Sequence, residues 1–174
     1  MADVNFAADA TTARPAAPAV LAPDAATIDF ELIELLFFAY RDFVGEPDQT
    51  LARFGFGRAH HRVLHFVSRN PGLRVTDLLD TLRITKQSLG RVLKELVDKG
   101  YVEQEQGAVD RRQRLLHATE RGRALALELS ARQSARLGRA LAGLPPEARG
   151  TVRDFLARMI DADAPRGAVA DDAE

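Results

Sequence analysis

Two apolar periodicities separated by a very short turn restrict the fold of this chain more than any other feature of its sequence. The first spans 75–82 and the second spans 85–99, and each has the three- and four-residue spacing of a helix buried on one side. Thr85 can cap the second helix at its start, and Gly100 can end it. Such a pair predicts a helix-turn-helix. The repeating residues are Val75, Leu78, Leu79 and Leu82, then Leu89, Val92, Leu93, Leu96 and Val97, with the tight turn Arg83-Ile84 between them.

The exposed side of the second helix carries residues that suit contact with DNA. Arg and Gln can each form two hydrogen bonds with a base edge, whereas Ser and Thr can bond to bases or phosphate. Gly90 costs about 1 kcal/mol in a helix relative to Ala, so we expect it where something approaches the backbone closely. The pattern predicts a recognition helix. Its candidate contact residues are Thr85, Lys86, Gln87, Ser88, Arg91 and Lys94.

A polar, charged loop at 103–114 predicts a β-hairpin wing beside the recognition helix. It lies between Tyr101-Val102 and Leu115-Leu116, which we expect to be short strands. Its arginines suit the negative potential of a minor groove. We expect Asp110 to pair with an arginine and hold the tip in shape. The alternative for helix and loop together is a solvated surface with ordinary salt bridges, but turn, caps, stripe and basic loop agree with one another. The wing arginines are Arg111, Arg112 and Arg114.

The charge distribution points to the same region. The chain has a net charge of -1, but residues 57–123 hold 14 Lys and Arg against 8 Asp and Glu, while the rest holds 10 against 17. A basic middle within an acidic remainder is expected where one surface faces phosphate. The absence of cysteine excludes disulfides, thiolate metal sites and cysteine nucleophiles.

The first predicted helix begins at Thr27 as its N-cap and is apolar on nearly all sides. A helix of this kind must be covered on more than one side, which favours a subunit interface. We expect Gly45-Glu46-Pro47-Asp48 to end it. Its apolar residues are Ile28, Phe30, Leu32, Ile33, Leu35, Leu36, Phe37 and Phe38.

Three further helices complete the predicted set of six. The second runs through Ala59, Val63, Phe66 and Val67 and stops at Asn70-Pro71-Gly72. The fifth is capped by Thr119 and has an inward face of Ala124, Leu127, Ala131, Leu137 and Leu141. The sixth opens at Pro145-Pro146-Glu147, with an apolar side of Val152, Phe155, Leu156, Met159 and Ile160.

The chain resembles the MarR family of bacterial regulators over about residues 27–161. This resemblance implies a dimer in which the first, fifth and sixth helices interlock, with two wings on a pseudo-palindromic operator. It also implies that 85–94 reads bases and that Asp110 and Arg112 form the characteristic wing pair. The sequence His117-Ala118-Thr119 departs from the Leu-Thr that the family often has after the wing, so the residue at which the strand ends is not determined by the resemblance. The residues that carry it are Ile84-Thr85-Lys86-Gln87-Ser88, Arg91-Val92-Leu93, Leu96-Val97-Asp98-Lys99-Gly100-Tyr101-Val102, Asp110-Arg111-Arg112-Gln113-Arg114 and Leu115-Leu116-His117-Ala118-Thr119-Glu120-Arg121-Gly122.

Many family members release DNA when a small, often aromatic, ligand binds near the junction of dimer and reading units. The candidate residues for such a pocket here are Phe37, Phe38, Tyr40, Arg41, His61 and His65. The alternative is that the aromatics are interface core. The two histidines, at i and i+4 beside His60, also have the spacing of metal ligands, but no third ligand is evident and we assign no metal.

The sequence therefore predicts a mainly α fold, a winged helix-turn-helix with six helices and a two- to three-stranded β-wing, in an obligate dimer. We expect 1–26 to be a disordered Ala/Pro-rich leader, 27–56 a dimerisation helix and linker, and 57–123 the DNA-binding region. Dimerisation helices at 124–161 and an acidic disordered tail at 162–174 follow. No run has the length and apolarity of a membrane span, and a cytoplasmic location is the default.

The predicted function is a transcriptional regulator, by preference a repressor, with no cofactor beyond a candidate small-molecule effector. No catalytic constellation can be placed, so we predict no enzyme activity. Two alternatives remain open. A winged-helix protein-interaction module would lack tight, salt-dependent DNA binding, and a phosphotransfer signalling module would be labelled on histidine by a phosphodonor.

Overall fold

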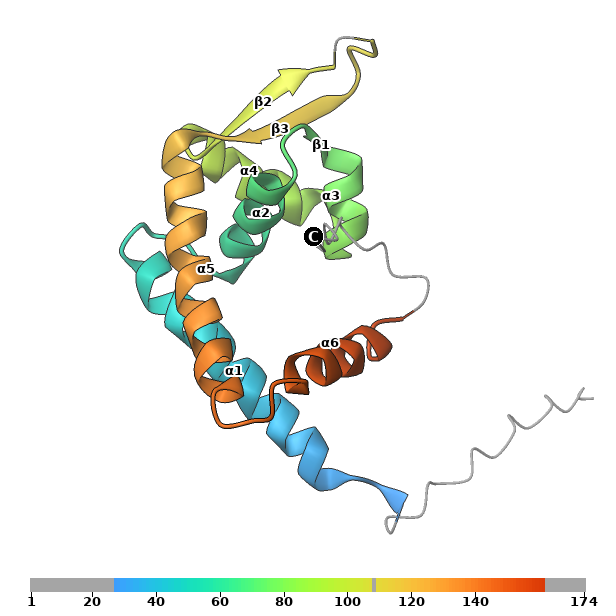
Figure 1. Ribbon diagram of the computed structural model, residues 1–174. Coiled ribbons are helices and arrows are strands. Elements are labelled where there is room, and N and C mark those ends of the chain that lie inside the picture. The colour runs from blue at the N-terminus through green and yellow to red at the C-terminus, as the bar shows by residue number, and fades with distance from the viewer. Residues whose placement is uncertain (1–26, 108, 162–174) are drawn as a thin grey trace, which may run out of the picture.

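A computed structural model describes residues 27–107 and 109–161 (Figure 1). The predicted leader at 1–26 and tail at 162–174 lie outside these residues. Six helices and a three-stranded antiparallel sheet of order β1-β3-β2 confirm the expected fold class. No helix in the described part of the chain is long and apolar enough to cross a membrane. The elements are α1 (Phe30–Ala52), α2 (Arg58–Arg69), β1 (Leu73–Arg74), α3 (Val75–Leu82), α4 (Lys86–Asp98), β2 (Val102–Gln106), β3 (Arg114–Ala118), α5 (Glu120–Leu141) and α6 (Ala148–Arg158).

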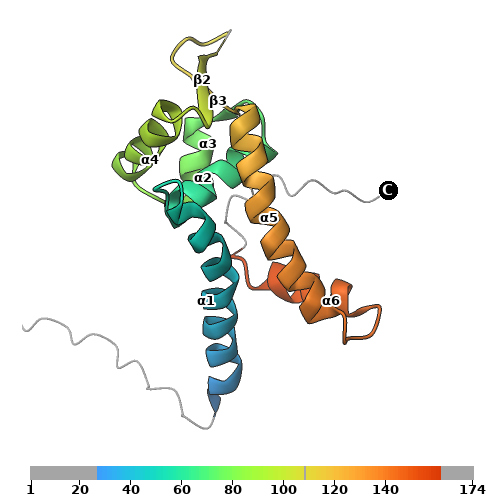
Figure 2. The same ribbon diagram turned by 90° about the vertical axis from the view of Figure 1, so that its left-hand side faces the viewer.

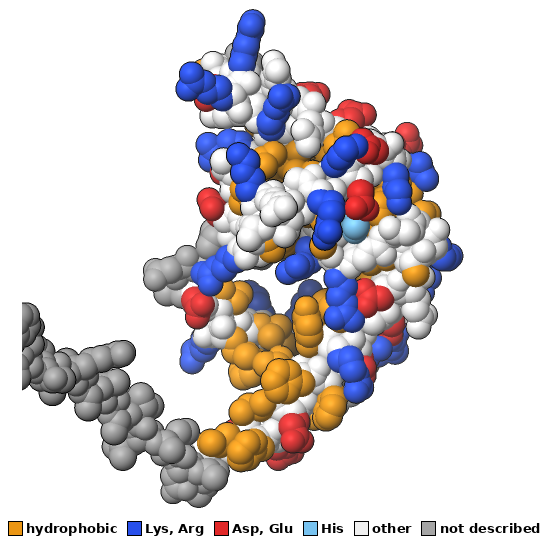
Figure 3. Space-filling view, turned by 180° about the vertical axis from the view of Figure 1, so that it is seen from behind, with side chains coloured by type: hydrophobic (Ala, Val, Ile, Leu, Met, Phe, Trp, Pro, Cys, Tyr) orange, Lys and Arg blue, Asp and Glu red, His pale blue; other side chains and the backbone are white. Residues whose placement is uncertain are grey.

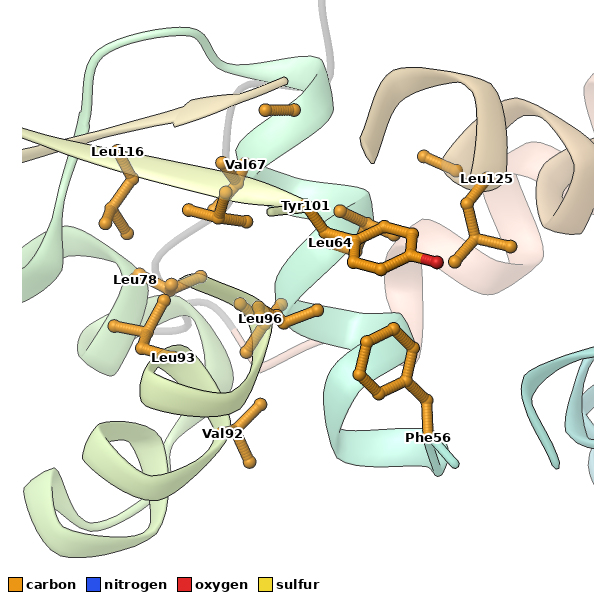
Figure 4. Close-up of a cluster of buried hydrophobic side chains, with 14 of the residues drawn as sticks. Phe56, Leu64, Val67, Leu78, Val92, Leu93, Leu96, Tyr101, Leu116 and Leu125 are labelled. Atoms are coloured by element: carbon orange, nitrogen blue, oxygen red, sulfur yellow. The ribbon is translucent and has the colours of Figure 1, made fainter. Parts of the chain in front are cut away.

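Residues 58–118 form the winged unit, which contains the helix-turn-helix and the sheet. Figure 2 shows it at one end of the molecule, with α1 and α5 running away from it and α6 folded back beyond α5. Its core is a cluster of buried Leu, Val and aromatic side chains from α2, α3, α4 and the sheet, joined by residues of α1 and α5 (Figure 4). Tyr101 lies at the centre of this cluster, edge-on to Phe56 with ring centroids 5.0 Å apart.

The helix-turn-helix has the predicted caps. Thr85 precedes α4, and its side-chain oxygen accepts a hydrogen bond from the Ser88 N–H at 3.2 Å. Arg83 closes the turn in the left-handed region (φ 49°), and Gly100 takes the same region (φ 72°) just beyond the end of α4. These positive angles turn the chain sharply at both ends of the recognition helix.

The prediction that α1 ends at Gly45-Glu46-Pro47-Asp48 is wrong, because the helix continues to Ala52 with Pro47 inside it. Pro47 has no N–H, so the carbonyl oxygen of Phe43 loses its usual helical donor. The side-chain amide of Gln133 on α5 donates to that oxygen at 3.5 Å. Packing of Pro47 in a buried position and this substitute donor allow the helix to persist. The N-cap also lies two residues later than predicted. It is Asp29, whose side chain accepts a hydrogen bond from the Leu32 N–H, and not Thr27.

The prediction of which residues of α5 face inward is wrong within the protomer, because a different set is buried. Its buried residues are Gly122, Leu125, Ala126 and Leu129, all in the first half, whereas Leu127 is 72% exposed. The helix has apolar residues on two sides, and the winged unit covers one of them. Ala124, Ala131 and Leu137 are likewise exposed.

The ends of the predicted strands and of the last helix also shift. β2 and β3 extend into the 103–114 loop as far as Gln106 and Arg114, and β3 ends at Ala118, immediately before the N-cap Thr119. β1 has two residues and pairs with β3 at Leu73↔Leu116, a strand that the sequence pattern did not indicate. The sixth helix begins at Ala148 because Pro145 forms a turn, with its carbonyl accepting from the Ala148 N–H at 2.9 Å.

Candidate nucleic-acid interface

The polar face of α4 is exposed, as the apolar stripe requires. Gln87, Ser88 and Arg91 line one shallow hollow on it. Arg91 and Gln87 have no hydrogen-bond or ion-pair partner within the described chain, so both side chains are available to a ligand. Lys94 is bound to Asp98, and this hydrogen bond raises the pKa of the lysine. The helix thus presents a hydrogen-bonding surface beside an ion pair in which Lys94 keeps further N–H donors for phosphate.

A groove of about 420 Å³ separates α4 from the wing. Its floor is apolar, formed mainly by Leu89, Leu93 and Val97, and its rims are polar. Gly90 opens into it, and a Cβ added there would meet nothing within 4 Å. The structure therefore brings two of the predicted cations of the helix, Lys86 and Lys94, and one of the wing, Arg114, to the two sides of one channel. The rim residues are Lys86, Lys94, Asp98, Gln104 and Arg114.

The two faces of the wing differ in charge. In β2 the side chains alternate, so Gln104 and Gln106 share the face of buried Val102, whereas Glu103 and Glu105 point to the opposite face. Glu105 lies 3.7 Å from His117 on that opposite face. The two glutamates of β2 are therefore turned away from the groove.

Gln104 is a candidate interface residue that the sequence analysis missed. The sequence predicts a loop over 103–114, in which the directions of successive side chains do not alternate. The alternating Val-Glu-Gln-Glu-Gln pattern of 102–106 is the signal that distinguishes the two faces once the segment is taken as a strand.

The tip of the wing is shaped by Asp110 through the backbone. Its carboxylate accepts from the backbone N–H of Arg112 at 2.9 Å, rather than from a guanidinium as expected. Gly107 allows the close return of the chain, because a Cβ there would lie 2.7 Å from the carbonyl oxygen of Asp110. Arg111, Arg112 and Arg114 remain exposed and without acidic partners in the described chain. Basic side chains accordingly project from the wing in Figure 3.

The candidate effector residues fall into two groups on different helices. Phe37, Phe38 and Tyr40 are more than half exposed on α1, and Arg41 pairs with Asp42 and lies 5.1 Å from the Phe38 ring. His61 and His65 are half-buried on α2. No hydrogen bond, ion pair or ring contact joins the two groups within the described residues. Within the protomer, the structure therefore does not bring the expected effector residues together.

The three histidines of α2 have different surroundings. His60 is engaged on both ring nitrogens, with Nδ1 accepting from the Gly57 N–H at 3.2 Å and Nε2 lying 2.9 Å from Glu95 on α4. It therefore links the start of α2 to the recognition helix. Burial lowers the pKa of both His61 and His65, with a smaller contribution from His65 and from Arg69, respectively. Among residues 27–107 and 109–161, no three His, Cys, Asp or Glu side chains gather as a metal site would need.

Acidification is expected to destabilise the protein through His61 and His65. Their folded pKa values lie below the ordinary value of 6.5, so the unfolded chain binds more protons in that interval and stability falls as the pH drops below about 6.5. The stabilising contribution is complete above that pH. Urea unfolding at about pH 7.5 and about pH 5.5 should show a smaller loss in a His61→Gln, His65→Gln double variant than in the wild type. Equal losses would contradict this assignment.

Comparison with known proteins agrees with this geometry. The sequence model of the MarR family matches residues 54–113. The HTH-type transcriptional regulator PetP of Rhodobacter capsulatus is 48% identical over 129 residues, which cover 74% of this chain and 78% of that protein.

Solved structures share the fold. FabT of Streptococcus pneumoniae, in complex with DNA, superposes with a TM-score of 0.66 at 20% identity, covering 74% of this chain and 92% of that one. CouR of Rhodococcus jostii, bound to p-coumaroyl-CoA, gives 0.63 at 25% identity, covering 75% and 92%. With the winged helix-turn-helix, the exposed face of α4 and the identity to PetP taken together, the chain belongs to the MarR family of helix-turn-helix transcriptional regulators and is not an enzyme.

Proposed function

We propose that the protein is a repressor that binds a pseudo-palindromic operator as a homodimer. In this proposal α4 enters the major groove, with Arg91 and Gln87 on base edges, and the wing arginines lie in the adjacent minor groove. The observation that carries the proposal is the exposed polar face of α4, on which Gln87 and Arg91 have no partner within the described residues. It lies beside an exposed basic wing on one side of the winged unit. A compact dimer on a promoter most simply represses by excluding polymerase.

The groove between α4 and the wing suits a strand of the DNA backbone. A strand that separates a major from a minor groove must pass between the elements that occupy them. The rims of the groove offer Lys86, Lys94 and Arg114 to phosphate, Gln104 adds a neutral donor, and the glutamates of β2 face away. This arrangement supports the orientation proposed for helix and wing.

Dimerisation is supported by apolar surface that the protomer leaves open. Phe37 is 69% exposed, and large apolar residues along the first half of α1 and along α6 are exposed as well. Figure 3 shows them gathered at the end of the molecule opposite the wing. A contiguous exposed region of large apolar side chains marks an interaction surface. A second copy satisfies it symmetrically, with the segments 27–56 and 124–161 as the dimerisation elements.

We further propose that a small aromatic ligand binds near the junction of the dimerisation elements and the winged unit and weakens operator binding. The exposed aromatics at Phe37, Phe38 and Tyr40, the guanidinium of Arg41 and the largely neutral imidazoles of His61 and His65 would line its pocket. Release of bound operator by members of a panel of aromatic carboxylates, and loss of that response in His65→Ala, would test it. A panel without effect on either protein would count against this ligand class.

A genomic-fragment binding selection with the purified full chain, repeated at two salt concentrations, tests the main proposal. We expect enrichment of a two-fold site with half-sites about one helical turn apart, and affinity that falls steeply with salt. Enrichment would also identify the target genes. No enrichment at low salt would reject the proposal and favour a winged-helix protein-interaction or phosphotransfer module instead.

Gly90→Ala is expected to raise stability and weaken DNA binding in the same protein. Alanine favours the helix by about 1 kcal/mol, and its Cβ meets nothing in the free protein. In the complex the added methyl group would stand in the channel proposed for the DNA backbone, so affinity should fall several-fold. Thermal unfolding and operator titration check the two parts. A variant that gained stability and kept full affinity would remove the backbone from this groove.

A further inference from the structure

At Pro47 one backbone hydrogen bond of α1 is missing, and this interruption of the hydrogen-bond ladder lies between two parts of the helix with different surroundings. Beyond it, Asp48 binds Arg58 of α2 at 2.7 Å and Leu51 is buried in the core of the winged unit. Before it, residues 30–41 are exposed and carry the apolar side chains proposed to contact a second copy. The same helix thus belongs to the winged unit at one end and to the proposed dimer surface at the other.

A proline in a helix interior removes a hydrogen bond and permits a bend, because the carbonyl four residues earlier has no donor. Here that carbonyl belongs to Phe43, and the Gln133 Nε2 of α5 donates to it at 3.5 Å. The neighbouring Glu46 accepts from Arg136 at 2.7 Å, and Arg139 lies 3.5 Å from the same carboxylate. Both contacts fall on the turn of α1 just before Pro47. Beyond the proline, Arg53 binds Glu128 of α5 at 3.0 Å, so α5 holds α1 on both sides of Pro47.

We propose that Gln133 and Arg136 are positioning residues that hold α1 rigid across Pro47 and thereby fix the separation of the two winged units in the dimer. The inference rests on the dimeric DNA-binding function proposed above. A bend at Pro47 would move the winged unit relative to the dimer surface, because the part of α1 after Pro47 is packed in the winged unit and the part before it carries that surface. The contacts of Gln133 and Arg136 with α1 therefore determine which spacing of half-sites the dimer accepts, and they do not affect contacts with bases.

The chemistry of the interruption offers a rescue that separates this role from a general structural one. Gln133→Leu removes the substitute donor and should loosen the joint. Pro47→Ala restores a backbone N–H that can reach the Phe43 carbonyl, so it should make Gln133 dispensable. The double variant Pro47→Ala, Gln133→Leu is expected to behave as the wild type, whereas a loss of α5 packing would persist in it.

Spin labels can report on the joint directly, because the natural chain has no cysteine. Glu34→Cys on α1 and Arg62→Cys on α2 are exposed positions on either side of Pro47. Labelled chains diluted into unlabelled ones give one labelled protomer per dimer. We expect a narrow distance distribution in the wild type, a broad one in Gln133→Leu and a narrow one again in the double variant. An unchanged width in Gln133→Leu, or a broad one in the double variant, would overturn the proposal.

Operator spacing gives the functional reading. The site selected by the wild type is compared with versions that have one base pair added or removed at its centre. We expect the preference of the wild type for its own spacing to shrink by about tenfold in Gln133→Leu, a size usual for coupling between sites, and to return in the double variant. Broadened distances with unchanged spacing preference would reject the link to DNA. If the wild type selects no two-fold site, the proposed function fails while the distance measurement still decides whether the contacts with α5 hold α1 rigid across Pro47.

Discussion

Gly122→Ala is expected to lower the free energy of unfolding by about 3 kcal/mol, at the upper end of what overpacking costs. Gly122 lies in the first turn of α5, where a Cβ would stand 2.0 Å from the carbonyl oxygen of Tyr101 and 3.4 Å from Leu64. The carbonyl cannot move away cheaply, because it accepts from the Thr119 N–H at 3.1 Å and its own ring is buried at the centre of the core (Figure 4). The junction of β2, β3 and α5 would have to open.

Chemical denaturation of the variant and of a matched control checks this expectation. Gly138 lies in the same helix with open space around its Cα, so Gly138→Ala should gain helix propensity, about 1 kcal/mol, instead of losing stability. A Gly122→Ala protein as stable as the wild type would show that the approach of Tyr101 to α5 is looser than this packing requires. The expected loss also gives a physical reason for glycine at this position of the family pattern.

Arg91→Ala is expected to weaken operator binding by about 1–3 kcal/mol and to relax specificity at one base pair of each half-site. The side chain is exposed on α4 beside Gln87 and Ser88 and has no partner within the described residues. Its removal should therefore leave the fold and its stability unchanged. The whole effect should appear in the complex, where an Arg reads guanine through two hydrogen bonds.

Binding of the variant to operators substituted one base pair at a time separates base reading from phosphate contact. Arg112→Ala serves as the contrast. It should weaken binding to most sequences about equally and reduce the slope of log affinity against log salt by about one unit. Unchanged operator affinity in Arg91→Ala would remove the base-reading assignment. A uniform loss in both variants would place Arg91 on the backbone.

The local features of the winged unit were predictable because they depend on residues close together in the chain. Thr85 and Thr119 cap the helices that follow them, and the stripe of α4 is buried as its spacing requires. The position of the wing between α4 and α5 was also predictable from two apolar pairs. Caps, stripes and hairpins are set within a few residues, and the sequence displays them directly.

The features that were missed depend on contacts between distant residues. The continuation of α1 through Pro47 needs Gln133, which is far along the chain, and nothing near the proline indicates it. The inward face of α5 depends on which of its two apolar sides meets the winged unit, since Leu125 and Leu129 compete with Leu127 in the pattern. β1 is two residues long and exists because β3 pairs with it. Tertiary packing decides each of these outcomes.

The alternation of β2 limits how the length of the wing can change. An odd insertion within the strand would exchange the faces of every following residue, turning glutamates toward the groove and glutamines away from it. An insertion of two residues, or one at the tip between Gly107 and Gln113, would preserve the assignment of faces. Whether the number of residues in β2 is odd or even is thus constrained, and β2 strands of related proteins should differ in length by even numbers of residues.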